Sequence, residues 1–368
     1  MNPVISLLGP TRKRSHLLLQ TLIVGLGRSG LGLHLPVLRK LRQDPLHDGL
    51  FTKEPPVGYD MSPEALRSAP PWLRAAPSPA ALRTMLDSGR TVVHLCTPPD
   101  ARTEALRELA ALGFRTFLVE KPLSAGIGAV HEIRRIRDAH GLRITVVAPW
   151  LHSTLTQRLA DLVQSGALGT LHSITVCQNK PRLSRTFAVP SHPSAFDVEP
   201  PHALGVALRL AGPARLVDAS WTDAHLGDRV ARRMGSARLR LQHDGGTTTT
   251  IACDLMSPVR ERSIRLTFAG GTVTGYYPVS ADDAYAQLSI EEPGVPERRE
   301  VFYDEALTAC VLRAYRDIAD GADFAPAFEL NAQVVSLLTD AKRRAAAESP
   351  YAPLPERAVP EEEALHAR

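Results

Sequence analysis

The stretch TLIVGLGRSG, residues 21–30, decides the fold. It starts as a short apolar, β-branched run, which is typical of a buried strand, and the leucines that follow it have helical spacing. Between strand and helix stands G-x-G-x-x-G: its glycines permit a tight turn, close approach of a pyrophosphate, and close packing of helix on strand. The stretch therefore predicts a dinucleotide bound at a helix N-terminus rather than a purely structural turn. The expected binding residues are Gly25, Gly27, Arg28, Ser29 and Gly30.

The chain around this turn alternates between strand-like and helical segments. Further strand candidates lie at residues 56–59, 92–96, 116–119 and 143–147. Short connections between alternating strands and helices imply a parallel sheet with right-handed crossovers. We therefore expect a doubly wound Rossmann domain of the α/β class over residues 21–148, preceded by an N-terminal extension over residues 1–20.

The pattern changes after Trp150. One helix is expected at residues 154–165, and two more at 307–320 and 331–347. Strand-like runs lie at residues 171–178, 214–222, 237–243, 247–255 and 262–269. This predicts a second, α+β domain over residues 149–348, built on a large open-faced, mostly antiparallel sheet. Residues 349–368 lack apolar periodicity and are interpreted as a surface arm or a disordered tail.

Composition narrows the class of protein. The 368 residues carry 22% charged side chains and a net charge of +4, without an aromatic-interleaved basic patch, which disfavours a nucleic-acid partner. The 4 cysteines show no metal-ligand spacing, and the histidines are scattered, so no metal site is expected and a reducing cytoplasm fits best. No apolar run is long enough to span a membrane.

Asp60 ends the second strand candidate and is placed to accept hydrogen bonds from an adenosine ribose. A carboxylate there repels a 2′-phosphate, so NAD is favoured over NADP. The spacing from the glycines is longer than usual because residues 43–56 read as an insertion, and Asp60 could instead cap the next helix. Arg28 could favour a phosphate, which keeps NADP open.

Three motifs together carry a family resemblance. The glycine turn, CTPP at residues 96–99 and VEKP at residues 119–122 resemble the Gfo/Idh/MocA family of glucose-fructose oxidoreductase and inositol dehydrogenase relatives. GALG at residues 166–169 and His202 extend the resemblance. It implies a Rossmann domain followed by an open-faced sheet that commonly builds dimers or tetramers, with sugars, cyclitols and related polyols or ketones as substrates.

The resemblance assigns roles at the Glu-Lys-Pro motif. Lys121 matches a lysine that lies near the nicotinamide and the reacting hydroxyl, and a partly desolvated ammonium can donate to a developing alkoxide. Glu120 and Pro122 would shape the turn, with Pro122 in a cis peptide. The loop expected beside the nicotinamide contributes Cys96, Thr97 and Pro98. The alternative for Lys121 is a surface lysine after a strand.

His202 matches the histidine of the family's D-x-x-x-H pattern and would relay a proton or bind a substrate hydroxyl. Val198 stands where the pattern has its aspartate, and Asp197 and Glu199 are the neighbouring carboxylates that could replace it. Gly205 also replaces an acid often found in the family. These departures weaken the inference of ordinary polyol dehydrogenation, and His202 could instead be a structural histidine.

Four further residues are candidates for substrate binding. Lys180 and Arg182 could bind a phosphate, a nucleotide diphosphate or a carboxylate, or could be solvent-facing loop residues. Trp150 and His152 stand at the entry to the second domain, where Trp150 could stack on a sugar ring or pack at the domain junction.

The leading hypothesis is an NAD(P)-dependent oxidoreductase acting on a carbinol or ketone carbon of a sugar, aminosugar or cyclitol, working as a homodimer or homotetramer. A second hypothesis is imine or enamine reduction, which needs a single proton donor and tolerates the missing aspartate. A third is a dinucleotide-binding sensor or scaffold that has lost its chemistry.

Overall fold

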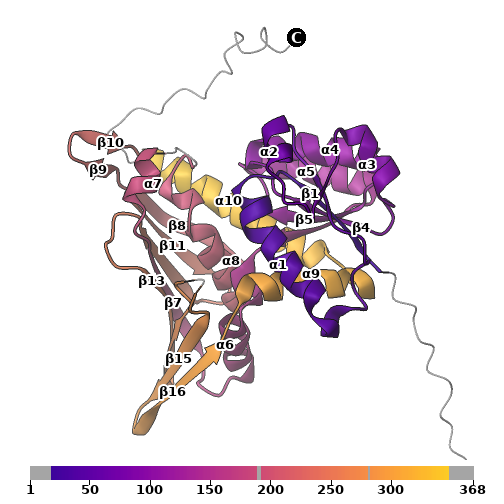
Figure 1. The fold of residues 1–368 in the computed structure, drawn as a ribbon. Coiled ribbons are helices and arrows are strands. Elements are labelled where there is room, and N and C mark those ends of the chain that lie inside the picture. The colour runs from indigo at the N-terminus through magenta and orange to yellow at the C-terminus, as the bar shows by residue number, and fades with distance from the viewer. Residues whose placement is uncertain (1–17, 189–191, 281, 348–368) are drawn as a thin grey trace, which may run out of the picture. The chain divides into compact units, whose positions relative to one another are not determined.

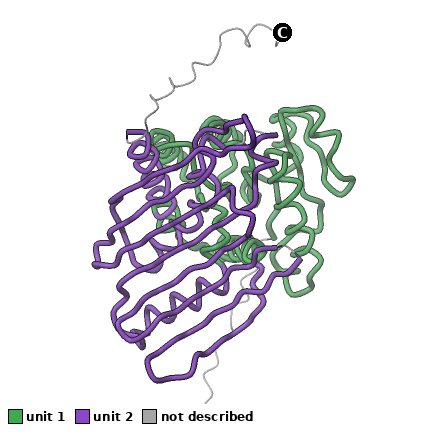
Figure 2. Tube along the Cα trace, turned by 90° about the vertical axis from the view of Figure 1, so that its left-hand side faces the viewer, with its two compact units in different colours: residues 1–152, 306–329 green, residues 153–305, 330–368 purple. Residues whose placement is uncertain are grey.

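The computed structural model describes residues 18–188, 192–280 and 282–347. It divides into two compact units: unit 1 runs to His152 and includes Ala306–Glu329, whereas unit 2 contains Ser153–Glu305 and the chain from Leu330 onward (Figure 2). Most of the predicted N-terminal extension and the predicted tail lie outside the described residues. The last residue assigned to that extension, Gln20, is the first residue of a strand.

The described part of unit 1 holds a six-stranded parallel sheet in the order β3-β2-β1-β4-β5-β6 (Figure 1). The strands are β1 (Gln20–Val24), β2 (Val57–Tyr59), β3 (Arg74–Ala75), β4 (Thr91–Leu95), β5 (Thr116–Glu120) and β6 (Arg143–Val147). The winding direction reverses between β1 and β4. In such sheets ligands bind outside the carboxyl ends of the strands at this switch point. The order confirms the predicted doubly wound fold.

Helices and helical turns connect these strands. They are η1 (Gly30–His34), α1 (Leu35–Gln43), η2 (Pro45–His47), α2 (Pro63–Arg67), α3 (Pro79–Met85), η3 (Pro99–Ala101), α4 (Arg102–Ala111), α5 (Ile127–His140) and η4 (Pro149–His152). The first of them, η1, is a π-helical turn that leads directly into α1. The strand β3 and the helix α3 were not expected from the sequence, because both are too short to show a clear period.

Unit 1 also contains α9 (Ala306–Asp320), far along the chain from its other elements. Its buried residues follow a spacing of three and four, as an amphipathic helix requires, and it packs against α1, β6 and η4. The sequence boundaries placed this helix with the second domain. Periodicity reveals an apolar face, but it does not show which sheet that face covers.

The described part of unit 2 holds an eight-stranded mixed sheet in the order β16-β15-β14-β13-β7-β12-β11-β8. Only β7 and β12 pair in parallel in this sheet as described, so it is mostly antiparallel, as predicted. The strands are β7 (Leu171–Asn179), β8 (Ala214–Trp221), β11 (Ser236–His243), β12 (Thr248–Asp254), β13 (Glu261–Phe268), β14 (Gly271–Tyr276), β15 (Tyr285–Glu292) and β16 (Val295–Tyr303), and β9 (Ala224–Leu226) pairs with β10 (Arg229–Ala231) apart from them.

The helical elements of unit 2 gather on one face of this sheet. They include α6 (Thr154–Ser165), α7 (Leu183–Ala188), η5 (Ala195–Asp197) and α8 (Pro200–Ala211), and most of α10 (Ala325–Ala347) belongs to the same unit. In particular, α8 packs on β7 and β12, and α6 packs on β15. Figure 2 looks onto the opposite face, which we call the open face. Its exposed side chains include Tyr276, Tyr285, Val301 and Tyr303.

Candidate functional site

The glycine turn connects β1 to η1. A Cβ on Gly30 would lie 2.0 Å from the carbonyl oxygen of Gly25, and Gly25 itself has φ +92° and lies against the backbone of Cys96. A Cβ on Gly27 would meet no atom within 4 Å among the described residues. Packing therefore requires two of the glycines, whereas the third faces open space at the switch point, where a phosphate group could approach the backbone.

Asp60 lies directly beside this turn. Its Oδ2 accepts a hydrogen bond of 2.7 Å from the backbone N–H of Leu26, and its Oδ1 accepts one of 2.8 Å from Ser62. Ser62, not Asp60, caps α2 with its hydroxyl. The carboxylate thus ties the end of β2 to the glycine turn, and each oxygen keeps a further lone pair for a ligand hydroxyl.

The loop after β4 carries two buried donors. Thr97 Oγ1 and Arg102 Nη1 have no hydrogen-bond partner within the described parts of the chain. Arg102 is only 2% exposed, and its Nε donates to the Thr97 carbonyl oxygen at 3.2 Å. Burial lowers the pKa of Arg102 to about 10, although Glu120 and Cys96 act in the opposite direction. Sequence reasoning missed Arg102, because it resembled any other arginine on a predicted helix.

The turn after β5 contains Glu120, Lys121 and a cis peptide before Pro122, as predicted. Glu120 Oε2 accepts from the backbone N–H of Lys121 at 3.1 Å. Its Oε1 accepts from the Ser29 hydroxyl at 2.7 Å and lies 2.9 Å from Nε2 of His34. Glu120 therefore links the turn that carries Lys121 to the glycine turn.

Buried polar side chains of unit 1 form a row of contacts that begins at Glu120. His34 Nδ1 lies 2.7 Å from His94 Nδ1, and His94 Nε2 lies 2.9 Å from the hydroxyl of Tyr315. That hydroxyl lies 2.6 Å from Thr21 Oγ1. His34, His94 and Tyr315 are each 0% exposed. None of the three stands in a recognisable motif, so their contacts could not be predicted from the sequence.

The charges in this row are unequal. Burial disfavours a charged His34, yet Cys96 and Glu120 raise its pKa from 6.5 to about 10. Burial likewise disfavours an ionised Glu120, but the hydrogen bond and the charge of His34, with help from Ser29, lower its pKa to about 2. Burial and the His34 charge both lower the pKa of His94. The row therefore contains an imidazolium, a carboxylate and a neutral imidazole.

Unit 2 brings Glu199 and His202 together at the start of α8. Glu199 is 4% exposed and pairs with Lys180, and Arg262 Nε lies 3.8 Å from its other oxygen. Burial would raise the pKa of Glu199, but the charges of Lys180, His202 and Arg262 lower it to about 2. Asp197 has different contacts. It forms an ion pair with Lys342 of α10 and accepts a hydrogen bond from the Ser194 hydroxyl. Of the two neighbouring carboxylates, Glu199 is the one grouped with His202.

Lys180 and Arg182 are not solvent-facing loop residues. The Lys180 ammonium points to Glu199, and Arg182 is 5% exposed. Gln178 precedes them on β7, is 0% exposed, and neither of its side-chain polar atoms has a hydrogen-bond partner in the described chain. It pairs in register with Arg262 and Cys253. Sequence reasoning missed Gln178 and Arg262, since strand pairing alone brings them beside Lys180.

Trp150 and His152 both belong to η4 of unit 1. Trp150 is 7% exposed, and η4 packs against α9. This burial favours the packing role for Trp150 over a stacking surface for a sugar ring.

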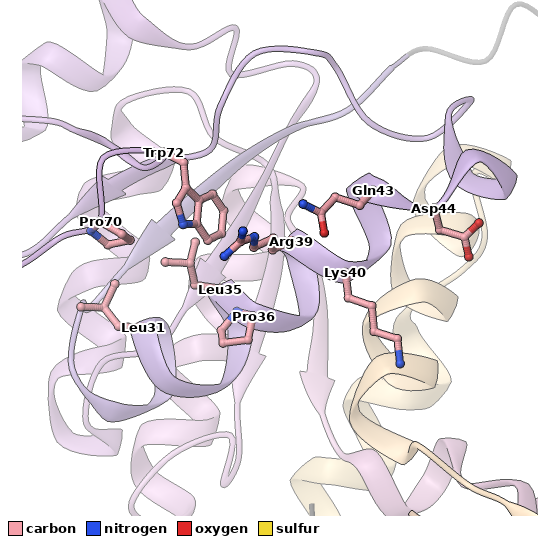
Figure 3. Close-up of a pocket in the computed structure, with 9 residues that line it drawn as sticks. All are labelled: Leu31, Leu35, Pro36, Arg39, Lys40, Gln43, Asp44, Pro70 and Trp72. Atoms are coloured by element: carbon pink, nitrogen blue, oxygen red, sulfur yellow. The ribbon is translucent and has the colours of Figure 1, made fainter. Parts of the chain in front are cut away.

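A cavity of about 620 Å³ lies beside α1, where residues of this helix face Pro70 and Trp72 (Figure 3). The Arg39 guanidinium faces the Trp72 ring there, 5.7 Å from its centre. The lining residues are Leu31, Leu35, Pro36, Arg39, Lys40, Gln43, Asp44, Pro70 and Trp72. Neither Glu120 nor Lys121 is among them, so this cavity is separate from the residues grouped around the turn.

Among the described residues, no group of three or more histidine, cysteine, aspartate or glutamate side chains is arranged to hold a metal ion. No helix in the described segments is both long and apolar enough to cross a membrane.

Comparison with protein-family models and with curated proteins gave no match. Solved structures do match over most of the chain. KijD10, a 3-ketoreductase from Actinomadura kijaniata in complex with NADP and TDP-benzene, is 15% identical with a TM-score of 0.72, and the match covers 89% of this chain and 98% of that one. The chain shares its fold.

Two further structures have the same fold. A protein from Desulfitobacterium hafniense, proposed to be an NADPH-dependent oxidoreductase, is 14% identical with a TM-score of 0.74, covering 89% of this chain and 95% of its own. An oxidoreductase from Agrobacterium radiobacter, in complex with NAD+, L-tartaric acid and magnesium, is 14% identical with a TM-score of 0.68, covering 89% and 96%. These matches confirm the Gfo/Idh/MocA-like fold predicted from the sequence motifs.

Proposed function

We propose that this chain is an NAD(P)-dependent oxidoreductase acting on a carbinol or ketone carbon of a sugar, aminosugar or cyclitol. The observation that carries the proposal is the glycine turn at the switch point of the sheet. Gly27 faces open space there, and among the described residues Thr97 Oγ1 and Arg102 Nη1 are buried donors without a partner. Donors of this kind suit phosphate and ribose oxygens, so the residues fit a dinucleotide.

Lys121 is the proposed proton donor and acceptor. A bound nicotinamide supplies the hydride chemistry, and the protein supplies orientation and proton transfer. Glu120 fixes the backbone of Lys121 through its N–H, which holds the start of the lysine side chain in place. A half-buried ammonium at this turn can donate a proton to a developing alkoxide, or take one up in the opposite direction.

On the substrate side we propose His202 as the hydroxyl-binding or proton-relay group, with Glu199 rather than Asp197 as its companion carboxylate. Two cationic side chains, Lys180 and Arg262, contact this carboxylate. Cationic side chains at this position favour a substrate with an anionic substituent, such as a phosphate, a nucleotide diphosphate or a carboxylate. The TDP-benzene complex of KijD10 supports a nucleotide diphosphate as the first class to test.

Asp60 favours NAD in this proposal, because its carboxylate would repel a 2′-phosphate. The exposed Arg28 on the same turn keeps NADP in consideration. Titration of the protein with each oxidised dinucleotide decides between them. Asp60→Asn should reduce the ratio of the Kd for NADP to the Kd for NAD.

An imine or enamine substrate is the second candidate. Val198, which stands where the resembling family has its aspartate, is 3% exposed and apolar. Reduction of an imine nitrogen needs a single proton donor, which Lys121 or His202 could supply alone.

The test is a screen of NADH and NADPH oxidation against nucleotide-diphosphate ketosugars, free ketosugars, keto-cyclitols and cyclic imines. We expect turnover of one class, and a fall in kcat/KM of at least about 100-fold in Lys121→Ala, as is usual when a general acid is lost. Lys53→Ala, which changes an exposed lysine of the same unit, is the matched control. Equal rates for Lys121→Ala and wild type would remove the lysine from the mechanism. Dinucleotide binding without turnover of any substrate would favour the hypothesis of a dinucleotide-binding sensor that has lost its chemistry.

A further inference from the structure

The hydrogen bonds of the buried row that starts at Glu120 can run in either of two directions, and the charge of Glu120 favours one of them. Glu120 is ionised, so Nε2 of His34 must donate to it. Only one proton fits between the two Nδ1 atoms of His34 and His94, which are 2.7 Å apart. When His34 supplies that proton it is a cation, and His94 is the neutral tautomer with its proton on Nε2.

The rest of the row agrees with this order. The Nε2–H of His94 donates to the Tyr315 hydroxyl, which donates in turn to Thr21 Oγ1. With the opposite order, His94 would supply the shared proton, and a neutral His34 would still donate its Nε2–H to Glu120 but carry no charge. A buried carboxylate is stabilised more by a cation in direct contact than by a neutral donor. The polar groups that face His34 are Glu120, Cys96 and His94, and Glu120 and Cys96 both favour the cation.

We propose that His34, held as an imidazolium, is a positioning residue for the dinucleotide site. The inference rests on the proposed function and adds to it. Glu120 accepts from Ser29 with one oxygen and from the Lys121 backbone with the other, so the cation that fixes Glu120 fixes both turns. The same cation cancels the carboxylate charge beside the glycine turn, where the anionic pyrophosphate would bind.

The charge state is tested directly by NMR of the full chain labelled with ¹⁵N-histidine. We expect one buried histidine to remain doubly protonated at pH 8, and another to remain the neutral Nε2–H tautomer at pH 6. Loss of each signal in His34→Gln and His94→Gln assigns the two rings. A neutral His34 at pH 8 would overturn the proposal.

Dinucleotide titration tests the consequence. His34→Gln keeps a donor of similar reach but no charge, and we expect its Kd to rise at least tenfold. Adding Glu120→Gln removes the uncompensated carboxylate, so the double variant should bind more tightly than His34→Gln alone. His131→Gln, on the exposed side of α5, is the control and should match wild type. Binding by His34→Gln within twofold of wild type would contradict the inference.

Tyr315→Phe covers the case in which His34→Gln does not fold. It removes the acceptor of the His94 Nε2–H, so we expect His34 to lose its proton at lower pH and the Kd to rise about threefold. An unchanged titration and Kd would count against the proposal. A wild-type chain that binds no dinucleotide overturns the proposed function, whereas a binding chain with neutral His34 overturns this inference alone.

Discussion

Gly27 and Gly30 stand in the same turn but are glycines for different reasons. Gly30 has no room for a side chain, because its Cβ would lie 2.0 Å from the Gly25 carbonyl oxygen. Gly27 has room, since no described atom lies within 4 Å of its Cβ position. The motif predicts these two requirements from the positions of the glycines, and the space around the two Cβ positions differs in the same sense.

Substitution of each glycine by alanine separates folding from binding. Gly30→Ala should lower the free energy of unfolding by about 1–3 kcal/mol, as overpacking does. Gly27→Ala should leave stability almost unchanged but weaken dinucleotide binding at least tenfold, because the methyl group occupies the space that the pyrophosphate needs. Thermal denaturation and dinucleotide titration measure the two effects. Gly128→Ala, at an open position on α5, is the control, and wild-type affinity in Gly27→Ala would refute the assignment.

At the scale of single residues, short sequence motifs predicted the residues that follow strands. Residues whose surroundings depend on tertiary contacts were missed. The glycines, Asp60, Glu120 and Lys121 follow strands at recognisable positions, so their location at the carboxyl edge of the sheet could be anticipated. His34, Arg102 and Gln178 carry no such signal. His94, the partner of His34, lies on another strand, and the burial of Arg102 and Gln178 becomes visible only in the folded chain.

Among the elements, α6 depends on a residue far away in the sequence. Asp304, which is 3% exposed, accepts hydrogen bonds from the Ser153 hydroxyl and from the backbone N–H groups of Thr154 and Leu155. These N–H groups are the first of the helix and lack partners within it. The Asp304 carboxylate thus caps α6 together with the Ser153 hydroxyl, which accepts from the backbone N–H of Thr156.

Asp304→Ala should therefore lower the free energy of unfolding by about 2 kcal/mol, since it leaves buried donors unpaired. Urea denaturation followed by circular dichroism measures the change. Asp228→Ala, in the exposed turn between β9 and β10, should have little effect. Equal stabilities for the two variants would show that other groups or water satisfy the helix end.

Helices and strands with a strong hydrophobic periodicity were predicted from the sequence, and those without it were not. The five other strands of the unit 2 sheet correspond to predicted runs, but β14, β15 and β16 were missed. Nearly every residue of β16 is exposed, so it has no apolar alternation to detect. The helix α8 was not expected from the sequence, although it begins with two prolines and proline is favourable in the first turn of a helix.

At the scale of the whole molecule, the His34–Glu120 pair should make stability depend on pH. Against the effect of burial, Cys96 and then Glu120 raise the pKa of His34 from 6.5 to about 10, so the interactions of protonated His34 contribute fully below pH 6.5 and progressively less up to about pH 10. The slope from this one group is roughly 1.4 kcal/mol per pH unit. The pKa of Glu120 is lowered from 4.5 to about 2, so its contribution is present above pH 4.5 and is lost as pH falls toward 2.

Urea denaturation at pH 6 to 10 measures the alkaline slope. We expect the slope to decrease in His34→Gln and to remain in His131→Gln. Identical slopes for all three proteins would mean that His34 is not the titrating group.

The open face of the unit 2 sheet is the predicted surface for self-association. Tyr285 and Tyr303 pack edge to face there, with ring centres 5.7 Å apart, and Val301 is 64% exposed. We expect a dimer or tetramer by light scattering, which Val301→Lys should dissociate because it places a charge in the contact. Val259→Lys, at another exposed valine of the same unit, should not. A wild-type monomer would exclude this role for the open face.

The return of α9 to the first sheet means that the segment Ser153–Glu305 is inserted into unit 1, and that the chain returns to unit 2 after Glu329. A fragment cut after His152 would lack Cys310, Val311, Tyr315 and Ile318, and would expose the apolar side chains that they cover. It should precipitate, whereas the same fragment joined by a short linker to residues 306–329 should stay in solution. Dissection of this protein into its parts therefore has to follow the three-dimensional grouping and not the linear order of the gene.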